Sequence, residues 1–153
     1  MPRSNGRKQG KTRDLHGSAP DESRVVLLVI DMINAFDFDG ARGKPIAELL
    51  KPDDEDYFVL KPKHSGFQFT TLDVLLAHLG AERLILTGVA ANFCVLFTAH
   101  DAYMRDYHLI VPRDCVASQT EADDESALAH MAKVTKADVR PSSEIDFSVL
   151  QKC

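Results

Sequence analysis

Past its polar N-terminal stretch, the chain alternates between apolar runs and amphipathic segments. The run VVLLVI at 25–30 is continuously apolar and is followed by Asp31. A run without polar alternation is typical of a strand buried on both faces of a parallel sheet. The segments 56–61, 83–89 and 108–112 are also rich in apolar and β-branched residues, which predicts three further strands.

The sequence between these strands shows helical periodicity. TTLDVLLAHLG at 70–80 places its leucines on one face, and Gly80 is a typical C-terminal stop. Thr70 and Asp73 at the start of this segment resemble a capping box. PIAELL at 45–50 begins with a proline and predicts a short helix.

Two further helices and one strand complete the pattern. One helix is predicted over 94–107, directly after the strand at 83–89. Another is predicted over 120–134, and ADVRPSSEI at 137–145 predicts a short closing strand. Three side chains of the 120–134 helix are expected to face inward: Leu128, Met131 and Val134.

The order of these elements defines the fold class. Strands that alternate with helices predict an α/β fold with a mainly parallel, Rossmann-like sheet. Right-handed crossovers then place helices on both faces, which gives a three-layer α/β/α architecture.

Charge divides the chain of 153 residues into two parts. The first 13 residues carry five basic side chains and no acid, whereas the whole chain has a formal net charge of −5. We therefore expect a disordered basic tail over 1–23 and one folded domain over 24–153. Nucleic-acid binding through the basic tail, as an accessory protein, is an alternative that the sequence does not favour, because the acidic body repels phosphate.

Composition also limits the cellular setting. The chain shows no apolar run long enough to cross a bilayer and no N-terminal signal pattern, so we expect neither a membrane partner nor export. Three cysteines form no even-numbered disulfide framework. A reducing, cytoplasmic location is the resulting expectation.

Three reactive side chains follow predicted strands. Asp31 ends the first strand, Lys61 ends the second, and Cys94 lies five residues after Val89, which ends the third. The carboxyl ends of parallel strands form one edge, where ligands bind in open α/β sheets. We therefore expect a carboxylate, an ammonium and a thiol to converge there.

This set of side chains suits acyl transfer. A thiol at the first turn of a helix is expected to have a lowered pKa, because free backbone N–H groups and a nearby Lys61 ammonium stabilise the thiolate. Asp31 can accept the thiol proton and return it later. Backbone N–H groups around Ala91 to Cys94 can bind a developing oxyanion.

Structural interpretations of the same residues remain open at this point. Cys94 at a strand–helix junction can be a packed small hydrophobe, and Asp31 can serve as a cap for the next segment. Lys61 can be an ordinary solvated lysine, and Lys63 is a rival for any role given to it. His64 is either a base or a surface residue of the loop.

Three stretches resemble one known superfamily. VVLLVIDMINAF, VLKPKHSGFQFTTLDVLLAHLG and LILTGVAANFCVLFTAHDAYMRDYHLIVPRDCVAS are similar to the isochorismatase-like cysteine hydrolases. That superfamily includes nicotinamidases, N-carbamoylsarcosine amidohydrolases and related amidases. The resemblance covers most of 25–145, and its motifs are specific in combination.

The resemblance implies roles for individual residues. It places the catalytic triad on Asp31, Lys61 and Cys94, with the lysine in a K-x-x-x-S-[AG]-F pattern and the cysteine in G-V-A-x-x-C-V. It implies a cis peptide bond between Val89 and Ala90. The expected oxyanion and substrate-binding residues are Val89, Ala90, Ala91, Asn92 and Phe67.

One departure from the superfamily affects both fold and function. Members carry a longer stretch between the first aspartate and the lysine, so the short segment 34–57 predicts that one helix and one strand of the family fold are missing. Nicotinamidases place metal ligands in that stretch, and this sequence has no such set, so we expect neither metal nor cofactor.

Two functions follow from the resemblance. The first is a cysteine amidohydrolase that cleaves a C–N bond of a small molecule through a thioester. The second is a truncated, inactive homologue that serves as a subunit or binding module. The expected partners are a small-molecule substrate and, by resemblance, further copies of the chain in a homo-oligomer.

Overall fold

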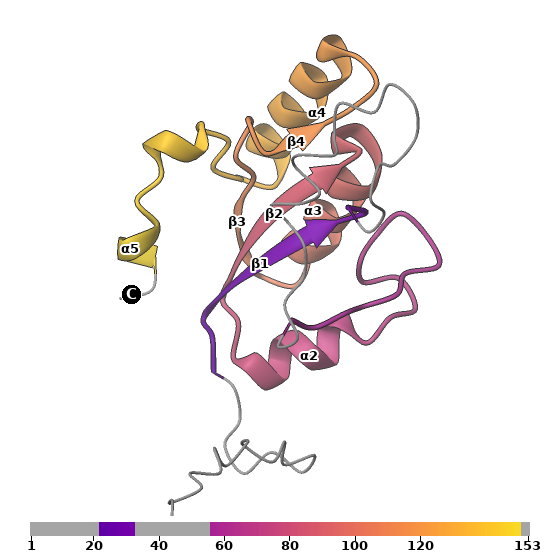
Figure 1. The fold of residues 1–153 in the computed structure, drawn as a ribbon, viewed down its shortest axis with the longest axis vertical. Coiled ribbons are helices and arrows are strands. Elements are labelled where there is room, and N and C mark those ends of the chain that lie inside the picture. The colour runs from indigo at the N-terminus through magenta and orange to yellow at the C-terminus, as the bar shows by residue number, and fades with distance from the viewer. Residues whose placement is uncertain (1–21, 33–55, 151–153) are drawn as a thin grey trace, which may run out of the picture.

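The computed structural model describes residues 22–32 and 56–150. Figure 1 shows strands gathered into one sheet, with helices packed along it. The elements, in chain order, are β1 (Val25–Ile30), α2 (Leu72–Leu79), β2 (Arg83–Val89), a π-helical turn η1 (Ala91–Val95), α3 (Leu96–Tyr103), β3 (His108–Ile110), β4 (Val116–Ala117), α4 (Glu121–Val134), a 3-10 turn η2 (Ser142–Glu144) and α5 (Phe147–Leu150). None of the helices in this part of the chain is long and apolar enough to cross a membrane.

The described strands form a parallel sheet around β2. β1 runs along one edge of β2, with Val25 opposite Arg83 and Ile30 opposite Gly88. β3 pairs with the first half of β2, and β4 pairs with its end at Gly88 and Val89. The predicted α/β fold with a mainly parallel, Rossmann-like sheet is confirmed.

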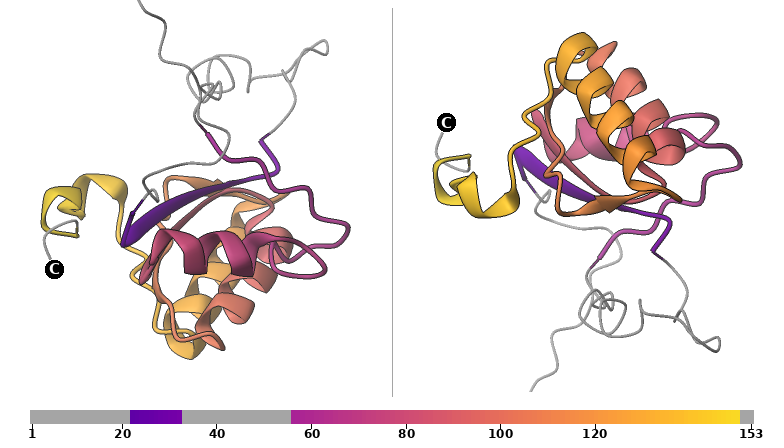
Figure 2. Two further views of the ribbon diagram at one scale, coloured as in Figure 1. Left: turned by 90° about the horizontal axis from the view of Figure 1, so that it is seen from below. Right: turned by 90° about the horizontal axis from the view of Figure 1, so that it is seen from above.

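One face of the sheet carries the main hydrophobic core. Both views of Figure 2 show α2, α3 and α4 on the same side of β1 and β2. Leu84 and Leu86 of β2 are fully buried there, together with Leu76 of α2 and Met131 of α4. Burial of each such side chain contributes about 2 kcal/mol, so this face holds the frame on which the site is built.

The end of the described chain covers only part of the opposite face. Ile145, which follows η2, packs against Ile85 and Ile110 in a second, smaller cluster. Farther along β1, Leu27 and Val29 are 55% and 41% exposed. In the described residues, the third layer of the predicted architecture therefore consists of the η2–α5 segment.

The predicted helices match the structure more closely than the predicted strands. α2 ends at Gly80, whose φ of 67° is the left-handed conformation that favours glycine. α4 begins at Thr120, whose side chain accepts the Asp123 N–H. The capping box at Thr70 and Asp73 is wrong, because Thr70 accepts the Leu72 N–H and Asp73 pairs with Arg105. Val134 is 39% exposed rather than inward.

Two predicted strands are absent from the described residues. Residues 56–61 form no strand, and Phe58 and Leu60 are exposed there instead of pairing in the sheet. In 137–145 only Asp138 bridges to Ile110, before the chain turns into η2. β4, with two residues, is too short for its pattern to be recognised in the sequence.

Some sequence expectations concern residues outside the described ranges. The helix at 45–50 and nearly all of the short segment 34–57 lie there, and so does the basic tail as far as residue 21. The missing helix and strand, and the disorder of the tail, therefore stay predictions.

Gly88 is where β1 and β2 approach most closely. Its φ is 105°, and a Cβ at this position would collide with the backbone carbonyl oxygen of Ile30. Its N–H donates to the Cys115 carbonyl at 2.9 Å. Only glycine fits both the conformation and the space, so Gly88 fixes the contact between the ends of β1 and β2.

Gly88→Ala is expected to lower the free energy of unfolding by about 3 kcal/mol, because strain and a backbone clash add. Gly80→Ala is the matched control. Its φ is also left-handed but its Cβ would meet open space, so we expect about 1 kcal/mol. Urea unfolding measures both values. Equal losses in the two variants would contradict the proposed close approach.

Candidate active site

Three side chains from separate segments meet beyond the ends of β1 and β2. The Lys61 ammonium lies 2.9 Å from the Asp31 carboxylate and 3.3 Å from the Cys94 sulfur. It also donates to the Lys63 carbonyl at 3.1 Å. The structure therefore brings the predicted trio together, and the rival Lys63 contributes its backbone oxygen to Lys61.

Asp31 is positioned by the turn that ends β1. Its φ is 58°, a left-handed conformation that aspartate tolerates better than most residues. This conformation ends the strand directly after Ile30, which pairs with Gly88. The carboxylate thus stands beside the segment that continues from β2.

Cys94 is positioned by an unusual turn rather than by the first turn of an ordinary helix. The Val89–Ala90 peptide bond is cis, as the resemblance implied. The chain then enters the π-helical turn η1, and the Val95 N–H donates to the Ala90 carbonyl at 3.1 Å. α3 begins only at Leu96.

Thr98 ties this turn to the loop that carries Lys61. Its fully buried hydroxyl donates to the Cys94 carbonyl at 2.7 Å and accepts the Gly66 N–H at 2.9 Å. Ser65 is also buried, and its hydroxyl accepts the Phe67 N–H at 3.1 Å. The Ser-Gly-Phe part of the lysine motif is therefore a structural anchor for Lys61.

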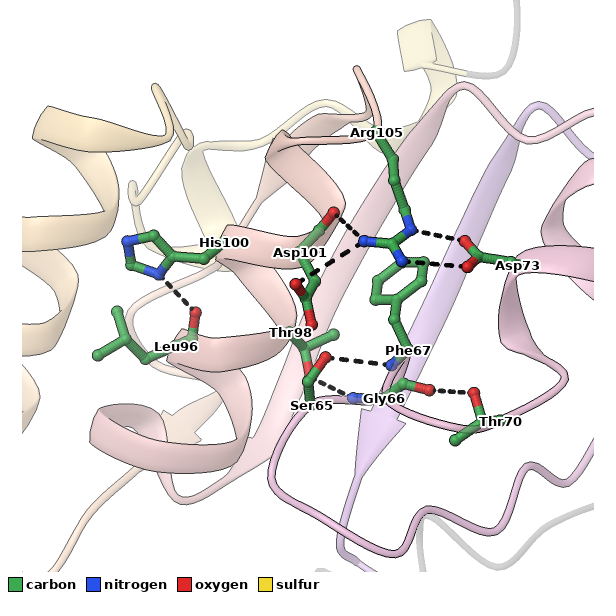
Figure 3. Close-up of polar contacts among 10 residues, drawn as sticks. All are labelled: Ser65, Gly66, Phe67, Thr70, Asp73, Leu96, Thr98, His100, Asp101 and Arg105. Atoms are coloured by element: carbon green, nitrogen blue, oxygen red, sulfur yellow. Dashed lines mark hydrogen bonds and ion pairs between the residues drawn. The ribbon is translucent and has the colours of Figure 1, made fainter.

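A second anchor holds the same loop from the far side, as Figure 3 shows. Arg105 makes two hydrogen bonds to the Asp73 carboxylate, at 2.7 and 3.1 Å, and one to the Asp101 carbonyl at 2.9 Å. Its guanidinium lies over the Phe67 ring, 4.6 Å from the centroid. Arg105 thus joins α2, α3 and the Lys61 loop.

The electrostatics of the trio correct one expectation. Burial raises the pKa of the Cys94 thiol, and so does the hydrogen bond that the thiol donates to the Asp31 carboxylate. These effects outweigh the Lys61 ammonium, which lowers the pKa. Burial lowers the pKa of Lys61, but Asp31 and the sulfur raise it overall. The predicted lowering of the Cys94 pKa is therefore wrong, because the sequence did not reveal how far the thiol is buried or how close the Asp31 carboxylate lies.

The expected oxyanion and substrate-binding residues fall into different environments. Ala91 is fully buried. The Asn92 N–H donates to the Ser118 hydroxyl at 3.2 Å and the Phe93 N–H donates to the Ala90 carbonyl, so both are engaged. Phe67 is only 5% exposed and packs with Tyr107 and Arg105, which places its ring in the core.

His64 joins the site, although the sequence left its role open. Its Nδ1 lies 3.7 Å from the Cys94 sulfur. The ring stacks on Phe97 and lies beside Phe93, with centroid separations of 5.6 Å in both cases. In the sequence, only its position three residues after Lys61 pointed to this site. A single histidine in a loop does not show which group its ring will contact.

The part of the chain that carries the candidate site also matches a known protein family. Residues 31–140 match the isochorismatase domain model, and this range contains Asp31, Lys61 and Cys94. The chain belongs to the isochorismatase family. Its resemblance to isochorismatase-like cysteine hydrolases is thereby confirmed.

Three similar proteins illustrate this family. An uncharacterized isochorismatase family protein, YaaI of Bacillus subtilis, is 47% identical over 104 residues, which cover 68% of this chain and 58% of the relative. Ureidoacrylate amidohydrolase RutB of Methylorubrum extorquens is 41% identical over 69 residues, or 45% of this chain and 28% of the relative. N-carbamoylsarcosine amidase from Thermoplasma acidophilum superimposes with a TM-score of 0.56 at 36% identity, covering 62% of this chain and 53% of that one.

The pH dependence of alkylation tests the electrostatics. Asp31→Asn removes a group that raises the pKa of Cys94, so iodoacetamide labelling of Cys94 should rise at lower pH than in the unmodified protein. Lys61→Met removes a group that lowers this pKa, so labelling should rise at higher pH. Peptide mass spectrometry measures both profiles, with Cys115 as the internal control. Identical profiles for the two variants would exclude the contacts described.

The Arg105 anchor predicts a measurable contribution to stability. Arg105→Met should lower the free energy of unfolding by about 1–2 kcal/mol, because a paired guanidinium and its ring contact are lost together. Arg24→Met is the control, since the exposed Arg24–Glu82 pair should contribute only about 0.5 kcal/mol. Thermal unfolding compares them, and an equal loss would argue against the anchor.

Proposed function

We propose that this isochorismatase-family chain is a cysteine hydrolase that cleaves the C–N bond of a small carboxamide or ureido compound. The observation that carries the proposal is the contact of one ammonium, Lys61, with both a carboxylate and a thiol. Amide cleavage needs a nucleophile, a proton carrier and a positive charge beside the developing anion. Cys94, Asp31 and Lys61 supply these in that order.

The first half of the reaction transfers the acyl group to sulfur. Asp31 accepts the Cys94 proton, and the sulfur attacks the carbonyl carbon of the substrate. The tetrahedral intermediate collapses when Asp31 returns that proton to the departing nitrogen. The C–N bond breaks, ammonia or an amine leaves, and a thioester remains on Cys94.

The raised pKa of Cys94 agrees with this sequence of steps. The thiol keeps its proton until substrate binds, so the thiolate forms next to the carbonyl that it attacks. Lys61 remains charged throughout and stabilises both the thiolate and the intermediate.

The backbone contacts reduce the number of candidate oxyanion donors. The N–H groups of Asn92 and Phe93 are engaged elsewhere and Ala91 is fully buried, so we assign the role to the N–H group of Cys94. A backbone donor of this kind contributes about 3 kcal/mol to transition-state stabilisation. Phe67 is left out of the proposed site, because its ring lies in the core.

The relatives support the proposed reaction class. RutB is named as an amidohydrolase that acts on ureidoacrylate, and the superimposed archaeal protein is named as an amidase of N-carbamoylsarcosine. Both names describe cleavage of a ureido or amide C–N bond. The chain spans 58% of YaaI and 28% of RutB, so activity on such compounds is a proposal for this protein.

Cys94→Ala tests the assignment. Ammonia release from a panel of small carboxamides and ureido acids should fall to background, because no acyl acceptor remains. Asp31→Asn should retain Cys94 but lose about 100-fold or more in rate, since its proton carrier is gone. Cys115→Ser is the matched control and should keep full activity.

Circular dichroism on each variant separates loss of chemistry from loss of fold. Turnover that persists in Cys94→Ala would contradict the cysteine mechanism. A folded protein that releases no ammonia from any panel member would favour the inactive-homologue interpretation instead.

A further inference from the structure

His64 is a fourth polar group at the reactive sulfur. Its Nδ1 lies 3.7 Å from Cys94 Sγ, close enough for a hydrogen bond to sulfur. This contact is separate from those of Asp31 and Lys61, although Lys61 lies three residues before His64 in the same loop. The second half of the reaction, hydrolysis of the thioester, also needs a base. Two acceptors then lie at the sulfur: the Asp31 carboxylate, which has returned its proton, and the His64 imidazole.

The surroundings of His64 fix its ring beside the sulfur. The imidazole stacks on Phe97 with an interplanar angle of 22° and lies at 34° to Phe93. Both phenyl rings come from the segment that also carries Cys94, the turn η1 and the start of α3. The ring therefore packs against the segment that carries the nucleophile, although His64 itself belongs to the Lys61 loop.

Exposure and ion pairing distinguish His64 from Asp31, the other proton acceptor at the sulfur. The Lys61 side chain is 16% exposed and the Asp31 side chain 36%, and these two are engaged with each other. His64 is exposed. Water that enters from solvent therefore meets the imidazole, and a neutral imidazole is the side chain best suited to act as a base near neutral pH.

We propose that His64 is the general base that activates water to hydrolyse the thioester on Cys94. This inference rests on the proposed function. With its proton on Nε2, neutral His64 accepts a proton from water at Nδ1 while the water oxygen bonds to the thioester carbon. The intermediate collapses, the C–S bond breaks, and Nδ1 returns the proton to sulfur. The carboxylic acid leaves, and both side chains are restored.

The charged groups near His64 are compatible with this role. Lys61 and Asp31 form an ion pair with no net charge, and both contact Cys94. Lys63, the neighbouring residue, offers its backbone carbonyl to Lys61. The ion pair thus adds no net charge beside the imidazole, whereas the neighbouring Lys63 side chain carries a positive charge.

A simple acyl donor separates the two half-reactions. p-Nitrophenyl acetate acetylates a reactive thiol and releases p-nitrophenolate, which measures the first half. After excess reagent is removed, intact-mass spectrometry follows the loss of acetyl from Cys94, which measures the second half. Cys94→Ala establishes how much acetylation occurs elsewhere.

Three variants at position 64 and one control test the role. His64→Ala and His64→Phe should slow the loss of acetyl by about 100-fold, while the acetylation rate stays within about threefold. His64→Phe keeps an aromatic ring against Phe97, so it controls for packing. His64→Asn keeps a polar group but no base and should also be slow. His78→Gln, at an exposed position of α2, should behave like the unmodified protein.

Added imidazole provides the decisive readout. It should accelerate the loss of acetyl in His64→Ala, where the space between Phe93 and Phe97 is open, but not in His64→Phe. A structural role would not be restored in this way. Rapid loss of acetyl from His64→Ala without imidazole, or equal slowing of both half-reactions without rescue, would overturn the proposal.

Failure of the proposed cysteine mechanism would give a result distinct from failure of the His64 role alone. If Cys94 in the unmodified protein is not acetylated above the Cys94→Ala background, both the cysteine mechanism and the His64 role are refuted. If it is acetylated and His64→Ala releases acetyl normally, only the His64 role is refuted.

Discussion

The Lys61 ammonium is the interaction on which the candidate site depends, because it contacts a carboxylate and a sulfur at once. Without it, Asp31 would repel a thiolate on Cys94. With it, transfer of the thiol proton to Asp31 leaves the net charge of the group unchanged. A partly buried cluster avoids the large desolvation cost of an isolated ion when its net charge stays constant. The raised pKa values of both Lys61 and Cys94 express this coupling.

The sheet determines where this cluster can form. Ile30 lies opposite Gly88, so Asp31 leaves β1 at the level where the chain leaves β2 toward Cys94. A shift of one residue would turn each side chain of β1 to the other face and move the carboxylate along the strand. Gly88 permits the close approach because a Cβ there has no space. The chemistry therefore depends on a backbone contact that includes no reactive group.

The sequence predicted the parallel sheet and the positions of Asp31 and Cys94, because both follow long apolar runs whose ends mark strand ends. Lys61 lies at the site for a different reason. Its segment forms no strand, and the loop is held by Thr98 and Arg105, which lie more than thirty residues away in the sequence. Such tertiary contacts leave no local pattern. The predicted direction of the Cys94 pKa was wrong for the same reason, since tertiary burial of the thiol raises this pKa most and the Asp31 carboxylate adds to it.

Burial divides the site into two environments around one sulfur. The inner part contains charged partners that neutralise each other, and the outer part contains an exposed imidazole held by two phenyl rings. Departure of an amine needs a proton delivered close to the attacked carbon, whereas entry of water needs access from solvent. A single acceptor would have to serve both environments in turn. In the reaction that we propose, two acceptors that differ in exposure give each half-reaction its own proton path, and His64 then acts beside the three residues that the sequence identified.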